Sequence, residues 1–177
     1  MSFLINAYHA QSLDNFLGYT NDDMKFSIQY PSNWQVKENA ESAPDRVWFE
    51  LSDRSLPIFA VDTEKNEPHV DTDTIESHGD THTMTLKNTT LQQLVQHELE
   101  EMSSEFRNFD LIRQNKVIVG GNDGWKMEFA GEDNFYLLEI CTIANGRIYI
   151  LTYQDYPSKV PETLPLANKM VDSFQIK

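Results

Sequence analysis

The stretch F-S-I-Q-Y-P-S-N-W, residues 26–34, decides the fold of this chain. Apolar and polar residues alternate from Phe26 to Tyr30, which is the period of two that a half-buried β-strand requires. Pro31 ends the strand, because proline has no N–H to donate to a neighbouring strand and keeps the residue before it extended. The chain then turns, and we expect Trp34 to return toward the core.

The composition indicates one folded domain with an acidic surface. The chain has 177 residues, of which 40% are hydrophobic, and this is enough to bury a single core. Its net charge of −14 argues against binding to nucleic acid or to an anionic membrane surface, since both need basic residues. Cationic partners fit this charge, as does the simpler interpretation that acidity keeps the protein dispersed. No apolar run approaches the ~20 residues that span a bilayer.

We divide the chain into a lead segment, residues 1–18, and a single domain, residues 19–177. The lead segment begins with an apolar run and contains Ala7 and Ala10, as the end of a secretory signal does, although the basic region of such signals is missing. We therefore favour an extracytoplasmic or secreted protein, and an ordinary chain start is the alternative. Cys141 is the only cysteine, so an intrachain disulfide is excluded, and its strand context indicates a small buried side chain.

The pattern of the domain predicts an antiparallel sheet. Asn145-Gly146 is the strongest hairpin signal, and Gly120-Gly121 marks a second hairpin. A turn is expected at residues 21–23, and the polar run at residues 38–45, which contains Pro44, predicts a loop. We expect strands at residues 13–19, 26–30, 34–37, 46–51, 56–62, 111–119, 125–130, 136–143, 147–153 and 175–177.

Two helices are predicted to cover this sheet. The first begins at Asn88-Thr89-Thr90, where Thr90 and Gln93 have the spacing of a capping box. Its apolar stripe consists of Leu91, Leu94, Val95, Leu99, Met102 and Phe106, and its outer face of Gln92, Gln96, His97, Glu100 and Glu101. The second helix is expected at about residues 162–173, with Pro161 and Pro165 near its first turn.

Several segments together resemble the PsbP-like family, in this order along the chain. They are the F-S-I-Q-Y-P-S-N-W stretch, the helix from Leu91 to Phe106, G-W-K-M-E-F at residues 124–129, N-G-R-I-Y-I-L-T-Y at residues 145–153, and M-V-D-S-F-Q-I at residues 170–176. The resemblance covers roughly residues 19–176, and residues 63–88 look like an insertion. It implies an α+β fold with one antiparallel sheet sandwiched between helices (α/β/α), which a small Ran-binding nuclear-transport factor also uses.

The resemblance also implies a class of function. The best-known members are extrinsic, lumenal subunits of photosystem II that help to retain calcium and chloride at the oxygen-evolving centre, and many relatives have no assigned role. This chain shows no plant-type N-terminal extension, so we expect a non-plant-type member. The shared residues are structural, so the resemblance transfers no catalytic residue and we expect no enzyme.

The insertion carries the candidate metal ligands. In an extended segment, His69, Asp71 and Asp73 point the same way, and so do His78, Asp80 and His82. Either trio offers imidazole and carboxylate groups to a divalent ion, and the second suits zinc, with manganese or calcium as other candidates. The alternative interpretation is a solvated polar loop, because the spacing matches no established metal motif.

A second pattern, His97-Glu98-Leu99-Glu100-Glu101, resembles the zinc-protease H-E-x-x-H motif without its second histidine. His97 and Glu101 share a helical face, so a metal pair is possible, but a charged outer face is the simpler interpretation. Tyr153 and Tyr156 are candidate surface aromatic residues for a partner, although core packing is the commoner role of such residues.

The sequence therefore leads to two hypotheses about function. The first is a non-catalytic accessory or binding protein that docks on a larger, membrane-associated assembly through a sheet edge or loops, with no membrane span of its own. The second is a divalent-metal-binding protein that uses the insertion between His69 and His82.

Overall fold

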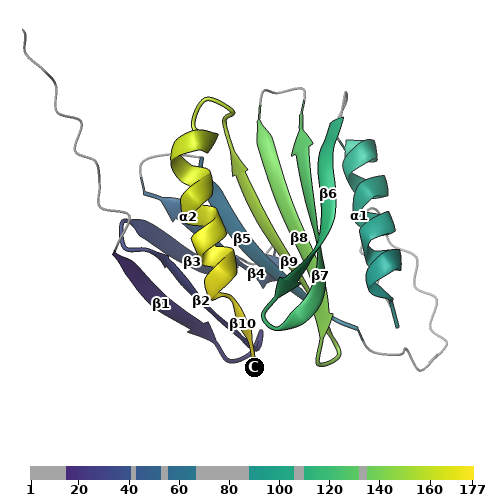
Figure 1. Ribbon diagram of the computed structural model, residues 1–177. Coiled ribbons are helices and arrows are strands. Elements are labelled where there is room, and N and C mark those ends of the chain that lie inside the picture. The colour runs from purple at the N-terminus through teal and green to yellow at the C-terminus, as the bar shows by residue number, and fades with distance from the viewer. Residues whose placement is uncertain (1–14, 41–42, 53–55, 67–87, 106–109, 132–134) are drawn as a thin grey trace, which may run out of the picture.

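The computed structural model describes residues 15–40, 43–52, 56–66, 88–105, 110–131 and 135–177. Two antiparallel sheets and two helices make up this part of the chain (Figure 1). The large sheet has the order β3 (Trp34–Ala40), β4 (Ala43–Leu51), β5 (Ile58–Lys65), β9 (Arg147–Asp155), β8 (Tyr136–Ala144), β7 (Asn122–Ala130) and β6 (Asp110–Val119). The small sheet has the order β1 (Phe16–Asn21), β2 (Phe26–Pro31) and β10 (Gln175–Ile176), and the helices are α1 (Leu91–Glu105) and α2 (Val160–Ser173).

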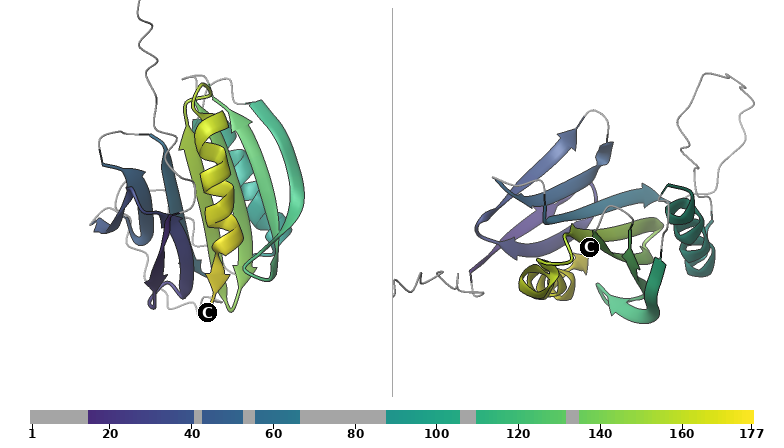
Figure 2. Two further views of the ribbon diagram at one scale, coloured as in Figure 1. Left: turned by 60° about the vertical axis from the view of Figure 1, so that its left-hand side comes forward. Right: turned by 90° about the horizontal axis from the view of Figure 1, so that it is seen from above.

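The expectation of one sheet between two helices is only partly correct. The helices do lie on opposite faces of the large sheet, as the view from above shows (Figure 2). The predicted strand at Phe26, however, belongs to the separate small sheet, which covers the same face of the large sheet as α2. The break at Pro31 explains the difference, because the chain leaves the small sheet there and enters the large sheet at Trp34. A period of two reveals a strand but not the sheet to which it belongs.

The main core lies between the small sheet, α2 and the large sheet. Phe26 of the small sheet stacks on Phe174, which follows α2, with ring centroids 5.4 Å apart. Tyr149 of β9 meets the same Phe174 ring edge-on at 5.8 Å. Phe49 of β4 and Phe59 of β5 are both fully buried in this core. Aromatic rings therefore fill the wide space between the two sheets.

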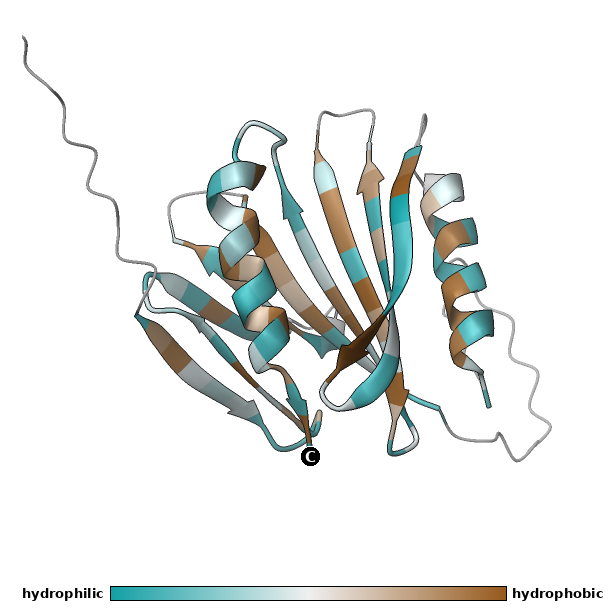
Figure 3. Cartoon of the chain, in the orientation of Figure 1, coloured by the Kyte–Doolittle hydropathy of each residue, from teal (hydrophilic) through white to brown (hydrophobic). Residues whose placement is uncertain are grey.

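A smaller core lies between α1 and the other face of the large sheet. Leu94 and Val95 of the helix pack on Met127 of β7 and Cys141 of β8. Figure 3 shows hydrophobic and hydrophilic residues alternating along α1, as expected of a helix with one buried face. Phe106, the last residue of the predicted stripe, lies outside the described residues.

The predicted start of α1 is confirmed in detail. The Thr90 backbone N–H donates to Oε1 of Gln93 at 2.9 Å, and the Gln93 backbone N–H donates to Oγ1 of Thr90 at 3.3 Å. These are the two reciprocal bonds of a capping box, which satisfy backbone donors that the first helical turn leaves free.

The hairpin turns follow the predictions, with one exception. Asn145 and Gly146 both have positive φ, at 51° and 72°, which is the backbone that a tight hairpin needs. Gly120 also has a positive φ of 55°, and a Cβ there would lie 3.1 Å from the Ile176 side chain, so glycine suits this turn. The predicted loop at residues 38–45 is wrong, because β3 continues to Ala40 and β4 begins at Ala43. Backbone pairing extends both strands through this polar sequence.

The ends of the predicted elements shift by a few residues. β1 begins at Phe16 and thus includes the last residues of the predicted lead segment. α2 begins at Val160, so Pro161 lies in its first turn but Pro165 lies inside the helix. β10 pairs with β2, as a short edge strand. Neither described helix combines the length and the apolar content that crossing a bilayer requires.

Candidate functional site

The candidate metal ligands of the insertion cannot be placed. β5 continues as far as Lys65, and residues 67–87 lie outside the described part of the chain. Both predicted trios are in this segment, namely His69, Asp71 and Asp73, and His78, Asp80 and His82. The ends of the segment are nevertheless held together. Asn66 Nδ2 donates to the Thr89 carbonyl at 3.0 Å, and the Thr89 N–H donates to Asn66 Oδ1 at 2.8 Å.

The β6 strand forms one end of the large sheet, and no described strand pairs with its outer edge. It is ten residues long and exposes Ile112 at 57% and Ile118 at 68%. Figure 3 shows hydrophobic residues at both ends of this strand and hydrophilic ones between them. Residues 111–119 include two basic residues and no acidic one, in a chain of net charge −14. This edge therefore differs from the acidic remainder of the protein.

The opposite end of the large sheet is formed by β3, which differs from β6. It is seven residues long, and its Lys37 forms an ion pair with Glu50 of β4. Both edge strands have a register irregularity, β3 between Glu38 and Ala40 and β6 between Leu111 and Arg113, and both carry a basic residue in an ion pair. They differ in length and in exposed apolar surface, because β6 is three residues longer and exposes Ile112 and Ile118. An exposed apolar edge strand favours pairing with another chain, so β6 is the better candidate for docking.

A cleft of about 640 Å³ opens beside the turn between β1 and β2. The Thr63 hydroxyl, at the cleft, is buried without a hydrogen-bond partner among the described residues. The cleft is lined by Asn21, Asp23, Met24, Glu38, Pro44, Asp45, Thr63, Glu64, Lys65 and Arg147. It is acidic on balance, but among the described residues no three of its carboxylates come within 4.8 Å of one another. The cleft could attract a cation but offers it no convergent set of ligands.

Two glutamates are buried beneath α1, where apolar residues are expected. Glu98 is only 5% exposed and lies on the apolar stripe of the helix, between Leu94 and Met102. Glu139 of β8 is 1% exposed and lies opposite Met127, on the sheet face that α1 covers. Glu98 belongs to the H-E-x-x-E pattern noted in the sequence, but its burial was not predicted. The signal was present, because Glu98 follows Leu94 by four residues and so shares its face.

Burial raises the pKa of both glutamates and so favours their protonated forms. Loss of water, together with the nearby charges of Glu139, Glu101, Asp62 and Glu64, raises the pKa of Glu98 to about 9. Burial also raises the pKa of Glu139 to about 7, although a hydrogen bond from the Cys141 thiol, at 3.7 Å, opposes the effect. At neutral pH the pair therefore binds protons or needs a cation nearby.

His97 and Glu101 stand at the outer side of the same cluster. His97 Nε2 lies 3.7 Å from Glu101 Oε2, and the two side chains are 26% and 45% exposed. One ligand atom each from His97, Glu98 and Glu101 lie within 4.8 Å of one another. The interpretation of a purely solvated outer face is thus incomplete, because a buried carboxylate joins the predicted pair.

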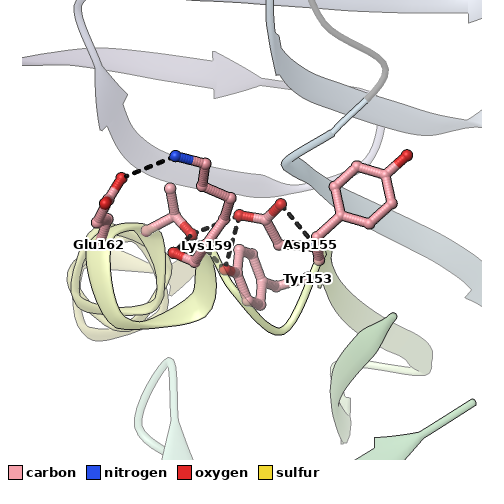
Figure 4. Close-up of polar contacts among 6 residues, drawn as sticks. Tyr153, Asp155, Lys159 and Glu162 are labelled. Carbon is pink, nitrogen blue, oxygen red and sulfur yellow. Dashed lines mark hydrogen bonds and ion pairs between the residues drawn. The ribbon is translucent and has the colours of Figure 1, made fainter. Parts of the chain in front are cut away.

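The polar network at the start of α2 has a structural role (Figure 4). Asp155 Oδ2 accepts a hydrogen bond from Thr163 Oγ1 at 2.6 Å, and its Oδ1 accepts one from the Tyr156 N–H at 2.8 Å. Tyr153 Oη lies 2.6 Å from the same Thr163 hydroxyl. These bonds attach the end of β9 to the first turns of α2. Tyr153 is fully buried, in agreement with the core-packing alternative, whereas Tyr156 is 49% exposed.

Cys141 has no features of a nucleophile. It is fully buried under α1, as predicted. Burial, together with the nearby carboxyl groups, raises the pKa of its thiol well above the usual value, so the thiolate form is suppressed.

Known structures share this fold at low sequence identity. The solution structure of cyanobacterial PsbP (CyanoP) from Synechocystis sp. PCC 6803 has a TM-score of 0.63 and 14% identity, and covers 98% of this chain and 99% of its own. LpqN, involved in cell envelope biogenesis of Mycobacterium tuberculosis, has a TM-score of 0.55 and 10% identity, over 93% of this chain and 86% of its own. A protein from Bacteroides thetaiotaomicron VPI-5482 has a TM-score of 0.55 and 14% identity, and the match covers 90% of this chain but 48% of that one.

Sequence comparisons place the chain in a family. A comparison with curated proteins gives no match. The family model for PsbP, by contrast, matches residues 14–176, which span both sheets and both described helices. The chain belongs to the PsbP family.

Proposed function

We propose that this protein is a non-catalytic accessory module that docks on a larger assembly outside the cytoplasm through the edge of β6. The observation that carries the proposal is this ten-residue edge strand, which exposes Ile112 and Ile118 and has no described neighbour on its outer side. Membership of the PsbP family supports a role within a protein assembly. The lead segment, with its signal-like composition, supports the location.

An extended segment of a partner protein is the occupant that this edge fits best. The free backbone N–H and C=O groups of an edge strand pair with an added strand, and alternate residues of a strand of this length, about five of them, each offer one N–H and one C=O. The exposed isoleucines would contact alternate apolar side chains of the segment. Arg113 and Lys116 favour acidic residues in it, although Arg113 already pairs with Glu128.

The proposal is tested by recovering partners from native membranes at low salt with three forms of the protein. Ile118→Lys places a charge on the β6 edge, and Leu17→Lys makes the same type of change at β1, where Leu17 is 45% exposed. We expect one partner to be retained by the wild type and by Leu17→Lys, and to fall at least tenfold with Ile118→Lys. Equal recovery with all three forms, or a free monomer at every ionic strength, would refute docking through β6.

The proposal includes the absence of catalysis. It rests on how the side chains that could act as catalytic groups are buried and bonded. Cys141 is buried and protonated, and Asp155, Thr163 and Tyr153 bond to one another at a helix start. None of these groups is poised toward a bound substrate. A buried cleft with converging reactive groups would be needed for an enzyme.

Metal binding by the insertion is a second proposal. The reciprocal bonds between Asn66 and Thr89 hold together the two described residues that flank this segment, next to the start of α1. Calorimetry with zinc, manganese and calcium would test it, with His78→Ala and His82→Ala as variants. We expect the heat of metal binding to fall in both variants. Titration curves identical to that of the wild type would exclude this segment as the metal site.

A further inference from the structure

The outer part of the acidic cluster beneath α1 has the geometry of a metal site. Glu101 follows His97 by four residues and Glu98 by three, so it is a neighbour of both on the helix surface, with Glu98 on the buried side. One imidazole nitrogen and two carboxylate oxygens from these residues lie within 4.8 Å of one another. Small side-chain rotations would bring three such atoms to the distances of about 2 Å at which a divalent ion binds.

Glu98 provides an independent reason to expect a ligand. Only 5% of the Glu98 surface is exposed, and the charged groups that act on its carboxylate are Glu139, Glu101, Asp62 and Glu64, all of them acidic. A buried carboxylate without a partner costs several kcal/mol of folding free energy, so natural proteins almost always give it one. One of its carboxylate oxygens lies within 4.8 Å of a ligand atom of His97 and of Glu101.

The charges around this group favour a cation. Glu139 lies on the sheet beneath Glu98, and Asp62 and Glu64 of β5 contribute negative charge as well. The basic groups described nearby are His97 and Arg46, and Arg46 is paired with Asp62. The cluster therefore holds more acidic than basic groups, and an added cation would balance it.

We propose that His97, Glu98 and Glu101 bind a divalent first-row transition metal ion, with zinc as the best probe. One imidazole and two carboxylates form a mixed nitrogen and oxygen set, which zinc and manganese accept, whereas calcium requires six or more oxygens. The ion enters from the solvent side, where Glu101 is 45% exposed. Water completes its coordination. The proposed ligands are different residues from the candidate ligands of the insertion.

The rival explanation is a carboxyl pair without metal, in which Glu98 and Glu139 retain or share a proton. Both explanations place acids under α1, but only a metal site requires His97 and Glu101. The experiment must therefore separate these residues from Glu139 and from the histidines of the insertion.

Calorimetric titration with zinc in a chain that lacks His69, His78 and His82 makes this separation. We expect one zinc per chain to remain, and His97→Ala, Glu98→Gln and Glu101→Gln each to weaken its binding at least tenfold. Glu100→Gln is the matched control, because Glu100 is exposed on the same helix and bonds to Gln96. It should leave the affinity unchanged. Circular dichroism confirms that each variant is folded.

A spectroscopic measurement tests the ligands directly. With cobalt as a substitute for zinc, the visible absorption should indicate nitrogen and oxygen ligands, and His97→Ala should alter it while Glu100→Gln should not. The proposal is overturned if the chain without the three insertion histidines binds no zinc. It is also overturned if Glu98→Gln binds zinc as the parent does, or if Glu100→Gln weakens binding as much as Glu101→Gln.

Discussion

The two faces of the large sheet are buried in different ways. On the side of α2, aromatic rings such as Phe26, Phe49 and Phe174 fill the core, and the polar groups at its rim bond to one another. On the side of α1, a smaller apolar core accepts two buried glutamates, Glu98 and Glu139, and the charged groups that act on Glu98 are all acidic. The buried carboxylate of Asp155, by contrast, accepts a hydrogen bond from Thr163. The two faces therefore differ in how their buried carboxylates are stabilised.

The largest effect is expected from removing an aromatic ring on the α2 face. Phe59 is fully buried and pairs with Phe49 at 6.3 Å, so Phe59→Ala leaves a cavity between the sheets. We expect a loss of about 4 kcal/mol in the free energy of unfolding, measured with urea. A loss below about 1 kcal/mol would show that this core is not closely packed, and the contrast between the faces would weaken.

The next effect is a pH dependence that arises on the α1 face. Glu98 has a pKa of about 9 in the folded protein, against the usual 4.5 of a glutamate. Folding raises this pKa, so the protonated Glu98 makes its full contribution to the free energy of unfolding below about pH 4.5. That contribution is lost as the pH rises toward 9. Glu98→Gln keeps the shape and removes the titration. In metal-free protein, we expect this variant to be more stable than the wild type by about 2–4 kcal/mol at pH 8.

The measurement of Glu98→Gln at pH 8 has two controls, the same variant at pH 5 and the variant Glu100→Gln. At pH 5 the folded Glu98 is protonated, so the advantage of Glu98→Gln should shrink to less than about 1 kcal/mol. Glu100→Gln, on the exposed side of α1, should change stability by less than about 0.5 kcal/mol at either pH. If Glu98→Gln has the same effect at pH 5 and pH 8, Glu98 does not ionise as burial implies.

Local sequence patterns predicted most of the elements of the fold. The alternation from Phe26 to Tyr30, the capping box at Thr90 and the turn at Asn145-Gly146 all depend on residues close in sequence, and the structure confirms them. The assignment of β2 to a second sheet depends on its pairing with β10, almost 150 residues later in the chain, which no local pattern encodes.

The candidate site was harder to predict because it combines distant residues. The pattern at His97 and Glu101 was visible, but the burial of Glu98 depends on the packing of α1 over β7 and β8. The position of Glu139 in the same cluster depends on strand register. A glutamate on an apolar helical stripe was the one local signal, and it becomes informative only when the facing strand is known.

The polar network on the α2 face should have an intermediate effect on stability. Thr163→Val removes the hydroxyl that donates to Asp155 and contacts Tyr153, both of which are buried. We expect the free energy of unfolding to fall by about 2 kcal/mol, since the Asp155 carboxylate loses a bond that it cannot replace with water. Thr163→Ser keeps the hydroxyl and should recover most of this loss. Equal losses in both variants would mean that the methyl group of Thr163, and not its hydroxyl, stabilises this corner.

The smallest effect is expected at the start of α1 and tests how firmly this helix holds the acidic cluster. Thr90→Ala removes one of the two capping bonds, so the helix should lose about 1 kcal/mol, measured with urea. Thr90→Ser retains the bond and is the control. Because Glu98 lies two turns further along α1, fraying at Thr90 should not expose it, and the pH dependence of stability should remain that of the wild type. If Thr90→Ala abolishes this pH dependence, the burial of Glu98 relies on the helix start and not on the sheet beneath it.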